Sequence, residues 1–532
     1  MVSPSQFGSD HGLDGISKLE TNVDALSREA QARVPAALEE RQRRARQAAL
    51  LEQQMGSPAT INSLQIHGAK NTRKTFLAPI FDPLVSPENN AGTTLGDVLA
   101  RLHEATNKLD RFEIFKPEPR VYLSSARDSD PLAAATDLDV DIRVAERGRW
   151  MLNTGTDLGN AEGSAYGNLL CRNLFGGAES LSLNAKAGTR TRSAYTTAFS
   201  TPINGDPDLR FSLEGLASAT EKPWANHEEV LRGGTARLAW RDPRTTNAHT
   251  LSLGSNWRQL TGLAGAASAS VRADAGDSVK TALTHTFTRD RRDRPVLAQS
   301  GYLMRTTSEL AGWGPLGGDV SFAKTELELA AAQPLPLPGI PAAKTGISVG
   351  AGLRFGLLCP LPLGFPSRGK AAAALAAPSR INDRFLLGGP TDVRGFKMGG
   401  LGPRDGADAL GGDVLAAGGV HMLLPLPRAG AESPLRLQLF ANGGRLVGIK
   451  NKGGKAKEAG AGAGMSQGAV VRGLQSAVAE VFNGLPSLAA GVGLVYAHPV
   501  ARFELNFSLP LVMRRGEEGR KGLQVGVGIN FL

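Results

Sequence analysis

The feature that most constrains this chain is a hydrophobic period of two residues that continues from about Gly148 to residue 532. Successive side chains of a β-strand point to opposite faces, so this period predicts strands with one apolar and one polar face. The strictest example comes last, where apolar residues at 523, 525, 527, 529 and 531 alternate with Gln524, Gly526, Gly528 and Asn530. The same alternation recurs around Leu183, Leu213, Leu253, Leu437 and Leu505. We therefore expect this part of the chain to be predominantly β-structure.

A membrane-spanning helix is not expected. The one uncharged stretch of at least 18 residues runs from Val481 to Ala501 and contains Pro486 and Pro499. If the chain enters a membrane, its backbone polar groups must be satisfied in a closed β-barrel. The 386 residues from 147 to 532 suffice for a transmembrane β-barrel of about 16 antiparallel strands. The period alone does not separate this barrel from a soluble β-sandwich or propeller.

The preceding segment has a mixed pattern. Thr94 and Asp97 have the spacing of a helix-capping box, and apolar residues then recur every three or four positions. Strand-like alternation surrounds Ile66, Val121 and Val140, giving the order β-α-α-β-β. Residues 57–146 are therefore predicted to form one small α+β domain. Residues 1–56 are predicted to be a charged helical or disordered extension.

Charge and cysteine content restrict the function only weakly. The chain has 60 basic and 50 acidic residues, and this formal charge of +10 permits an anionic partner without choosing lipid or nucleic acid. Its two cysteines, Cys171 and Cys359, are too few for a disulfide framework. Residues 1–56 hold seven basic and eight acidic residues and no apolar run, so neither a secretory signal nor a matrix-targeting presequence is expected.

Two short motifs resemble catalytic signatures, but their contexts favour ordinary structure. Residues 464–468 match GxSxG, yet a Gly- and Lys-rich segment precedes them in place of a strand. Residues 364–370 resemble a phosphate-binding loop, but Ala371 stands where a magnesium-binding hydroxyl is needed. The eight histidines lack paired metal-ligand spacing. We expect no metal site, no cofactor and no enzymatic activity.

The segment Phe385–Phe396 reads FLLGGPTDVRGF. It resembles the signature loop of the outer-membrane barrel-assembly superfamily of bacterial surface antigen type, in which GG and a short spacer precede [VI]RG[YF]. The following Gly402–Asp405 and Leu410–Asp413, the segment Asp290–Pro295 and the alternating end of the chain are similar to the mitochondrial sorting and assembly branch, the central barrel subunit. The α+β segment resembles a single polypeptide-transport-associated (POTRA) domain.

This resemblance implies an inward-folded loop at about residues 357–411, carrying the motif Val393, Arg394, Gly395 and Phe396. Its implied partners in the lumen are Phe440, Asn442, Gly444 and Glu504. The family's FxDxG motif reads FANGG here, with Asn442 in the acidic position, so another acid or water must compensate Arg394. Glu504 and Asp413 are the candidates, and the strand parity of Glu504 directs it to the lumen.

The resemblance also implies a function. It predicts a factor that folds and inserts β-barrel precursors into the mitochondrial outer membrane through a lateral gate between the first and last strands. The gate strand contains Val525, Gly526, Val527 and Gly528. Precursor barrels, accessory subunits and membrane lipids are the expected partners, without nucleic acid, and the POTRA-like domain is expected in the intermembrane space. The alternative is a passive polypeptide-translocation pore of the same superfamily.

Overall fold

The computed structural model describes most of the chain after residue 51. The described residues are 46, 49, 52–86, 92–117, 119–159, 162–336, 338, 345–363, 375–426, 430, 433–449, 464–498 and 501–528. They form two compact units, the first from Met1–Lys70 with Leu77–Glu146 and the second from Asn71–Phe76 with Arg147–Leu532. The predicted extension over residues 1–56 and the last four residues of the alternating pattern lie almost wholly outside the described residues.

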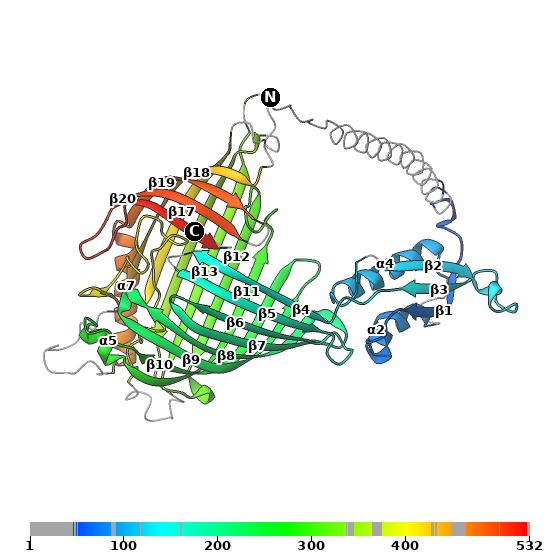
Figure 1. Ribbon diagram of the computed structural model, residues 1–532, viewed down its shortest axis with the longest axis horizontal. Coiled ribbons are helices and arrows are strands. Elements are labelled where there is room, and N and C mark those ends of the chain that lie inside the picture. The colour runs from blue at the N-terminus through cyan, green and yellow to red at the C-terminus, as the bar shows by residue number, and fades with distance from the viewer. Residues whose placement is uncertain are drawn as a thin grey trace, which may run out of the picture. The chain divides into compact units, whose positions relative to one another are not determined.

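The first unit is a three-stranded sheet with two helices (Figure 1). Its elements in chain order are β1 (Thr60–His67), α2 (Lys74–Val85), α4 (Leu95–Asp110), β2 (Arg120–Ser125), the short 3-10 helix η1 (Ala126–Asp128) and β3 (Asp137–Arg143). The predicted order β-α-α-β-β is confirmed. Strand β3 lies in the middle, parallel to β1 and antiparallel to β2.

Local sequence explains why these elements form where they do. Thr94 and Asp97 make the predicted capping box, in which each side chain accepts a hydrogen bond from the other residue's backbone N–H. One face of α4 then buries Val98, Leu102 and Leu109, at helical spacing. The central strand β3 buries Val140 and Ile142 on one face, which gives this small unit its core.

The second unit is a sheet of 16 strands that follow one another around a barrel (Figure 1). The strands are β4 (Trp150–Gly159), β5 (Glu162–Arg172), β6 (Ser180–Gly188), β7 (Thr191–Ile203), β8 (Asp206–Lys222), β9 (His227–Arg241), β10 (Asn247–Thr261), β11 (Gly276–Asp290), β12 (Gly301–Ala311), β13 (Phe322–Pro334), β14 (Ser348–Pro360), β17 (Val414–Pro425), β18 (Leu435–Val447), β19 (Ser487–Ala497), β20 (Arg502–Val512) and β21 (Gly522–Gly528). Every neighbouring pair is antiparallel, so the predicted fold class is confirmed.

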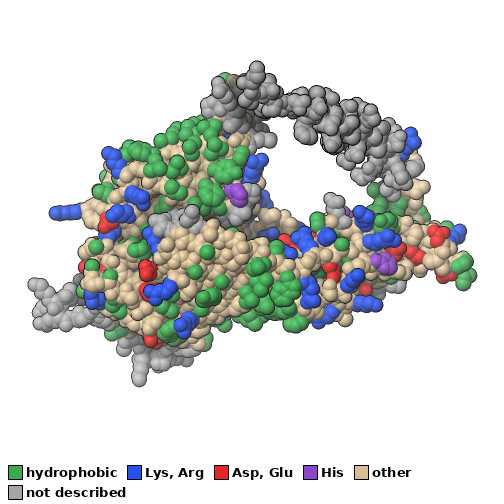
Figure 2. Space-filling view, in the orientation of Figure 1, with side chains coloured by type: hydrophobic (Ala, Val, Ile, Leu, Met, Phe, Trp, Pro, Cys, Tyr) green, Lys and Arg blue, Asp and Glu red, His purple; other side chains and the backbone are tan. Residues whose placement is uncertain are grey.

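The two faces of the barrel wall have opposite chemistry. In β20, Phe503, Leu505 and Phe507 are 41–44% exposed, whereas Glu504 is 1% exposed and Asn506 is fully buried. The outward face is apolar and the enclosed face is polar, which is the reverse of a soluble sandwich core and is typical of a transmembrane barrel. Figure 2 shows hydrophobic side chains gathered in patches on the visible face of the barrel, with other side chains and backbone between them. This distribution decides between the two β architectures that the period left open.

The remaining helices lie in connections between strands. They are η2 (Pro223–Ala225), α5 (Ala269–Ala273), η3 (Gly314–Leu316) and α7 (Gln467–Asn483). Helix α7 buries Ala477 and Val481 against Val414 of β17 and Val447 of β18. Its N-cap is Ser466, the serine of the GxSxG match, whose side chain accepts a hydrogen bond from the N–H of Ala469. No helix in the described part of the chain is long and apolar enough to cross a membrane.

The ends of the sheet are β4 and β21, the first and last strands of the barrel. Among the described residues, no ladder joins β21 to β4, whereas β21 pairs along its seven residues with β20. We call the junction between β4 and β21 the seam. It is the one junction between successive strands of the described sheet that no ladder of backbone hydrogen bonds joins.

Candidate functional site

The connection between β14 and β17 folds into the barrel. It is described over residues 361–363 and 375–413, and we call it the lumen loop. Because β14 continues to Pro360 and β17 begins at Val414, the loop covers 361–413 and not the expected 357–411. Residues 357–360 remain in the ladder between β13 and β14. A two-stranded turn, β15 (Arg404–Asp405) with β16 (Asp408–Ala409), lies near the loop's end.

Apolar side chains hold the loop against the inner wall. Leu387, Val393 and Phe396 have no exposed surface, and Leu401 is 2% exposed. They form one cluster with wall residues from β11 to β19, including Ala282, Phe322, Leu358, Leu415, Ala417, Leu446 and Ala489. Full burial of each large side chain contributes about 1.5–3 kcal/mol. The loop is thus packed as a core of the barrel. Gly444 leaves the space that Leu387 occupies, because an added Cβ there would lie 2.8 Å from the Leu387 side chain.

Arg394 forms a buried ion pair with Glu504 of β20. The Nε of Arg394 lies 2.9 Å from Glu504 Oε2, and the Nη2 of Arg394 lies 3.2 Å from Glu504 Oε1. The two side chains are 1% and 0% exposed. Arg502 also contacts Glu504, at 2.6 Å, so the two guanidinium groups share this carboxylate. Of the two candidate acids, Glu504 is therefore the ion-pair partner of Arg394. Asp413 instead accepts hydrogen bonds from the Ser379 side chain and the Ile449 N–H.

Strand β18 holds Arg394 from its other sides. The guanidinium carbon lies 5.0 Å from the centre of the Phe440 ring, in a cation–π contact. With the Asn442 amide oriented to meet complementary groups, its nitrogen donates to the Arg394 carbonyl at 3.2 Å and its oxygen accepts from the Arg394 N–H at 2.9 Å. An aspartate could accept the second bond but could not donate the first. The asparagine at the family's acidic position therefore suits a backbone clamp.

Gly395 is required by its surroundings. Its φ of +86° lies in the left-handed region, which L-residues with side chains rarely adopt. An added Cβ would lie 2.6 Å from the Cβ of Ala489 on β19. The Gly395 backbone thus turns directly against the barrel wall, which places Arg394 and Phe396 on either side of the turn.

The last strand also binds this turn. Gln524 of β21 accepts a hydrogen bond from the Gly395 N–H at 2.9 Å and donates to the Phe396 carbonyl at 3.3 Å. Ser508 of β20 donates to the same Gln524 oxygen at 3.1 Å. One buried amide therefore connects the motif to the strand that forms one edge of the seam.

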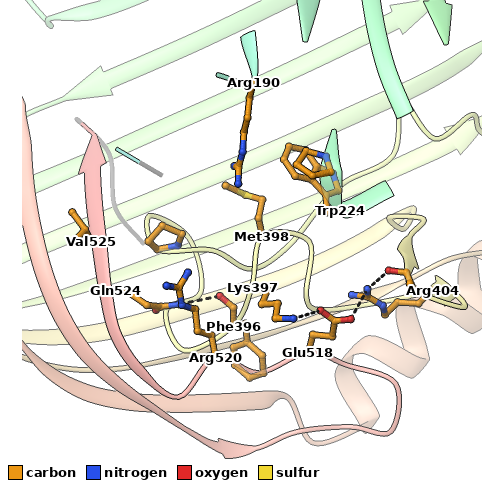
Figure 3. A pocket seen from close by; sticks show the side chains of 13 residues that line it. Arg190, Trp224, Phe396, Lys397, Met398, Arg404, Glu518, Arg520, Gln524 and Val525 are labelled. Carbon is orange, nitrogen blue, oxygen red and sulfur yellow. Dashed lines mark hydrogen bonds and ion pairs between the residues drawn. The ribbon is translucent and has the colours of Figure 1, made fainter. Parts of the chain in front are cut away.

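The hairpin between β20 and β21 extends this contact. Glu518 forms ion pairs with Lys397 at 3.0 Å and with Arg404 at 2.8 Å, as Figure 3 shows. The backbone of Gly400 and Lys397 also pairs with Glu518. Beside these residues is a pocket of about 320 Å³, lined among others by Trp224, Met398 and Val525 (Figure 3).

A second buried ion pair holds the start of the loop. Arg258 of β10 binds Asp383 through two hydrogen bonds, at 2.6 and 3.1 Å, and both side chains are nearly fully buried. Lys280 of β11 lies 3.4 Å from the same carboxylate. Burial by itself raises the pKa of the Asp383 carboxyl, but Arg258 and Lys280 outweigh it and hold that pKa below its ordinary value.

A second acidic residue of the loop, Asp392, faces another basic residue of the wall. It accepts a hydrogen bond from the Gly388 N–H at 3.1 Å and faces Arg354 of β14 at 3.4 Å. Burial raises the pKa of the Asp392 carboxyl in spite of the Arg354 charge. The lumen loop thus contacts β10, β14, β18, β20 and β21.

The structure brings most residues of the sequence motif together. Phe440, Asn442 and Glu504 each contact Arg394. Gly395 and Phe396 bind Gln524, and Val393 and Gly444 lie in the apolar cluster around Leu387. Val525 and Val527 face outward on β21, whereas Gly526 and Gly528 pair with Glu504 and Arg502. The sequence reasoning missed Gln524, Glu518, Arg258 and Asp383. Only the lumen-facing parity of Gln524 was visible beforehand.

These features define a class of protein. It is a membrane barrel of 16 strands whose lumen holds a connecting loop, and a glycine-containing turn on that loop is fixed to the wall through a buried arginine.

Comparison with known proteins identifies the family. Residues 173–531 match the model of the Omp85 superfamily domain. The chain is 37% identical over 479 residues to a SAM50-like protein of Schizosaccharomyces pombe, covering 89% of this chain and 91% of that protein. It is 33% identical over 441 residues to sorting and assembly machinery component 50 homolog A of Xenopus laevis, covering 82% and 84%. The chain belongs to the Omp85 superfamily and, within it, to the SAM50 proteins.

A solved structure agrees with this fold. The chain is similar to BamA from Haemophilus ducreyi lacking POTRA domains 1–3, with a TM-score of 0.64 and 14% identity, over 88% of this chain and 84% of that one.

Proposed function

We propose that this protein folds and inserts β-barrel precursors into the mitochondrial outer membrane, and that the seam between β4 and β21 is the lateral gate. The observation that carries the proposal is the seam itself. In the described residues it lacks the ladder that joins every other neighbouring pair of strands. The names of the similar sorting and assembly machinery proteins support the assembly role.

Strand pairing provides the driving force for insertion. A backbone N–H or C=O left unpaired in hydrocarbon costs several kcal/mol, so a strand edge exposed at an open seam favours pairing with another strand. A precursor strand satisfies those groups by adding to the edge. Each strand added moves the precursor into the bilayer without any covalent step, and we therefore propose no enzymatic activity.

The lumen loop sets the resting position of the gate in this proposal. Gln524 ties β21 to the turn at Gly395, and Glu504 and Asn442 tie that turn to β20 and β18. The edge strand is therefore held from inside the barrel by a loop whose own anchors reach β10. Opening at β21 must either move the loop or break the Gln524 contacts.

The other elements have supporting roles. We propose that the first unit is a POTRA-like domain in the intermembrane space, where it meets precursors before they reach the gate. The outward apolar faces of the strands contact membrane lipids, and accessory subunits of a sorting and assembly complex are further partners.

A passive translocation pore of the same superfamily is the rival function. The lumen loop opposes it, because Leu387, Phe396 and Leu401 are buried against the inner wall of the barrel. An unfolded chain would have to displace this cluster to pass.

The destination of a precursor tests the proposal. A labelled β-barrel precursor is imported into mitochondria before and after depletion of this protein, followed by carbonate extraction and protease treatment. We expect the precursor in the membrane pellet, folded and protease-resistant, and expect depletion to abolish that fraction. A precursor delivered across the membrane in soluble form would support the pore instead.

A further inference from the structure

A small cavity lies inside the barrel wall, on the side of Glu504 that carries Arg502. Its volume is about 50 Å³. Three polar side chains line it, those of Arg292, His421 and Arg502, and its other lining residues are Pro295, Val296, Ala298, Ala330, Ala331, Ala332, Ala351 and Gly352. None of these lining residues is an acid. The described wall of this cavity therefore offers basic groups and apolar surface.

Two guanidinium groups of the lining also bind carboxylates. Asp290 accepts two hydrogen bonds from the Arg292 side chain, at 2.9 and 2.7 Å. Glu504 is shared between Arg502 and Arg394, and all three side chains are at most 8% exposed. Guanidinium groups in so little solvent make an anion a more favourable occupant of the cavity than a cation.

The Nδ1 atom of His421 is a hydrogen-bonding group to which no described residue binds. The His421 ring lies across the backbone of Gly350, the residue paired with it on β14, where any Cβ would collide with the imidazole. The Nδ1 atom is buried and has no hydrogen-bond partner in the described part of the chain. A buried polar atom without a partner costs about 1–3 kcal/mol, so a ligand or water in the cavity is favoured.

The turn between β11 and β12 forms part of the cavity wall, through Pro295, Val296 and Ala298. Leu297 of this turn is 2% exposed and packs against Leu423 of β17 and Val495 of β19. One water molecule needs about 10–15 Å³ of cavity volume. The cavity of about 50 Å³ therefore has room for one small ion with a few waters. A nucleotide or a phospholipid headgroup does not fit.

We propose that this cavity binds one small inorganic anion, of which chloride is the physiological example. The anion would accept hydrogen bonds from His421 and Arg502 and would lie beside the ion pairs of Glu504. It would thereby stabilise the ion pairs that hold Arg394. This inference depends on the lumen geometry and is independent of the insertion function.

Chloride titration of the full-length protein in detergent tests the proposal. Potassium gluconate is replaced by potassium chloride at constant ionic strength, and two signals are followed: the thermal unfolding midpoint and the linewidth of the chloride NMR signal. For the native chain we expect a saturable rise of the midpoint and a saturable excess linewidth that bromide displaces. If neither signal saturates, the cavity holds water only and the proposal is wrong.

Two variants and a matched control locate the effect. His421→Phe keeps the ring volume and removes both nitrogens, and we expect chloride affinity to fall about tenfold or more. Ala298→Leu keeps every charge and fills the cavity, and we expect it to abolish saturable binding. His285→Phe, a histidine on the outer face beside His249, should leave binding unchanged. Equal chloride binding in the native chain and Ala298→Leu would overturn the proposal even if His421→Phe did not fold.

Discussion

The side-chain oxygen of Gln524 accepts a hydrogen bond from the backbone N–H of Gly395 at 2.9 Å. Gln524 belongs to the last strand of the barrel and Gly395 to the motif of the lumen loop. The loop is therefore bound directly to one edge of the seam, and its position and that of β21 depend on each other.

Replacing Gln524 should loosen the motif. Gln524→Ala removes both bonds to the turn and the acceptor for Ser508, at a cost of about 1–3 kcal/mol for buried groups left unpaired. We expect faster hydrogen exchange at residues 393–397. Leu523→Ala is the control, since Leu523 is 60% exposed on the opposite face of the same strand. Unchanged exchange in Gln524→Ala would show that the amide does not hold the loop.

Loss of the Arg394 charge should destabilise the barrel interior. Arg394→Met leaves Glu504 buried with one guanidinium in place of two, and breaking a buried pair costs about 3–5 kcal/mol. We expect a lower denaturation midpoint and slower precursor assembly, with the barrel still present in the membrane. The control is Lys397→Met, because the Lys397–Glu518 pair is largely exposed and contributes about 1 kcal/mol at most. Similar losses in both variants would contradict the assigned importance of burial.

Two costs of adding a side chain at Gly395 can be measured separately, the positive φ and the contact with the wall. Gly395→Ala introduces both an unfavourable positive φ and a contact of 2.6 Å with the Cβ of Ala489. Gly406 lies in the same loop with φ +60° and open space around it, so Gly406→Ala carries only the backbone cost of about 1–2 kcal/mol. We expect Gly395→Ala to lower the unfolding midpoint further, and Ala489→Gly to restore only the difference. No rescue by Ala489→Gly would place the strain elsewhere.

Acid should weaken the Asp383 anchor only at low pH. The pKa of Asp383 is held below its ordinary value of 3.8, so its stabilising contribution is complete above that value and declines as the pH falls through the lowered pKa. Hydrogen exchange at residues 379–385, corrected for intrinsic rates, should therefore stay constant from neutral pH to about pH 5. Asp383→Asn should exchange faster at neutral pH and lose the acid dependence. Loosening of the native segment already near neutral pH would contradict this assignment.

The barrel was predictable because its pattern is local. In β20 apolar and polar residues alternate, and this alternation predicts which residues share a face of the sheet. The apolar set is Phe503, Leu505 and Phe507, and the polar set is Arg502, Glu504 and Asn506. The same parity favoured Glu504 as the partner of Arg394. Its distance from Arg394 came only with the structure, as did the start of the lumen loop at residue 361.

The missed anchors depend on the path of the loop through the lumen. Arg258 and Asp383 are separated by 125 positions. Arg258 is the only Asp, Glu, Lys or Arg of β10, but its charge does not indicate which distant acid it binds. Gln524 likewise looks like any lumen-facing residue until Gly395 lies against it. The cap at Thr94 was visible in sequence because its two partners are three residues apart.

Closing the seam tests the central claim most directly. One cysteine is placed on β4 between Trp150 and Thr156 and the other at Val525, and precursor insertion is measured after verified oxidation and again after reduction. The control is Leu505→Cys with Val525→Cys, which crosslinks two strands already paired in the ladder. We predict that the seam crosslink stops insertion reversibly and that the control does not. Normal insertion through a fully crosslinked seam would contradict the lateral gate.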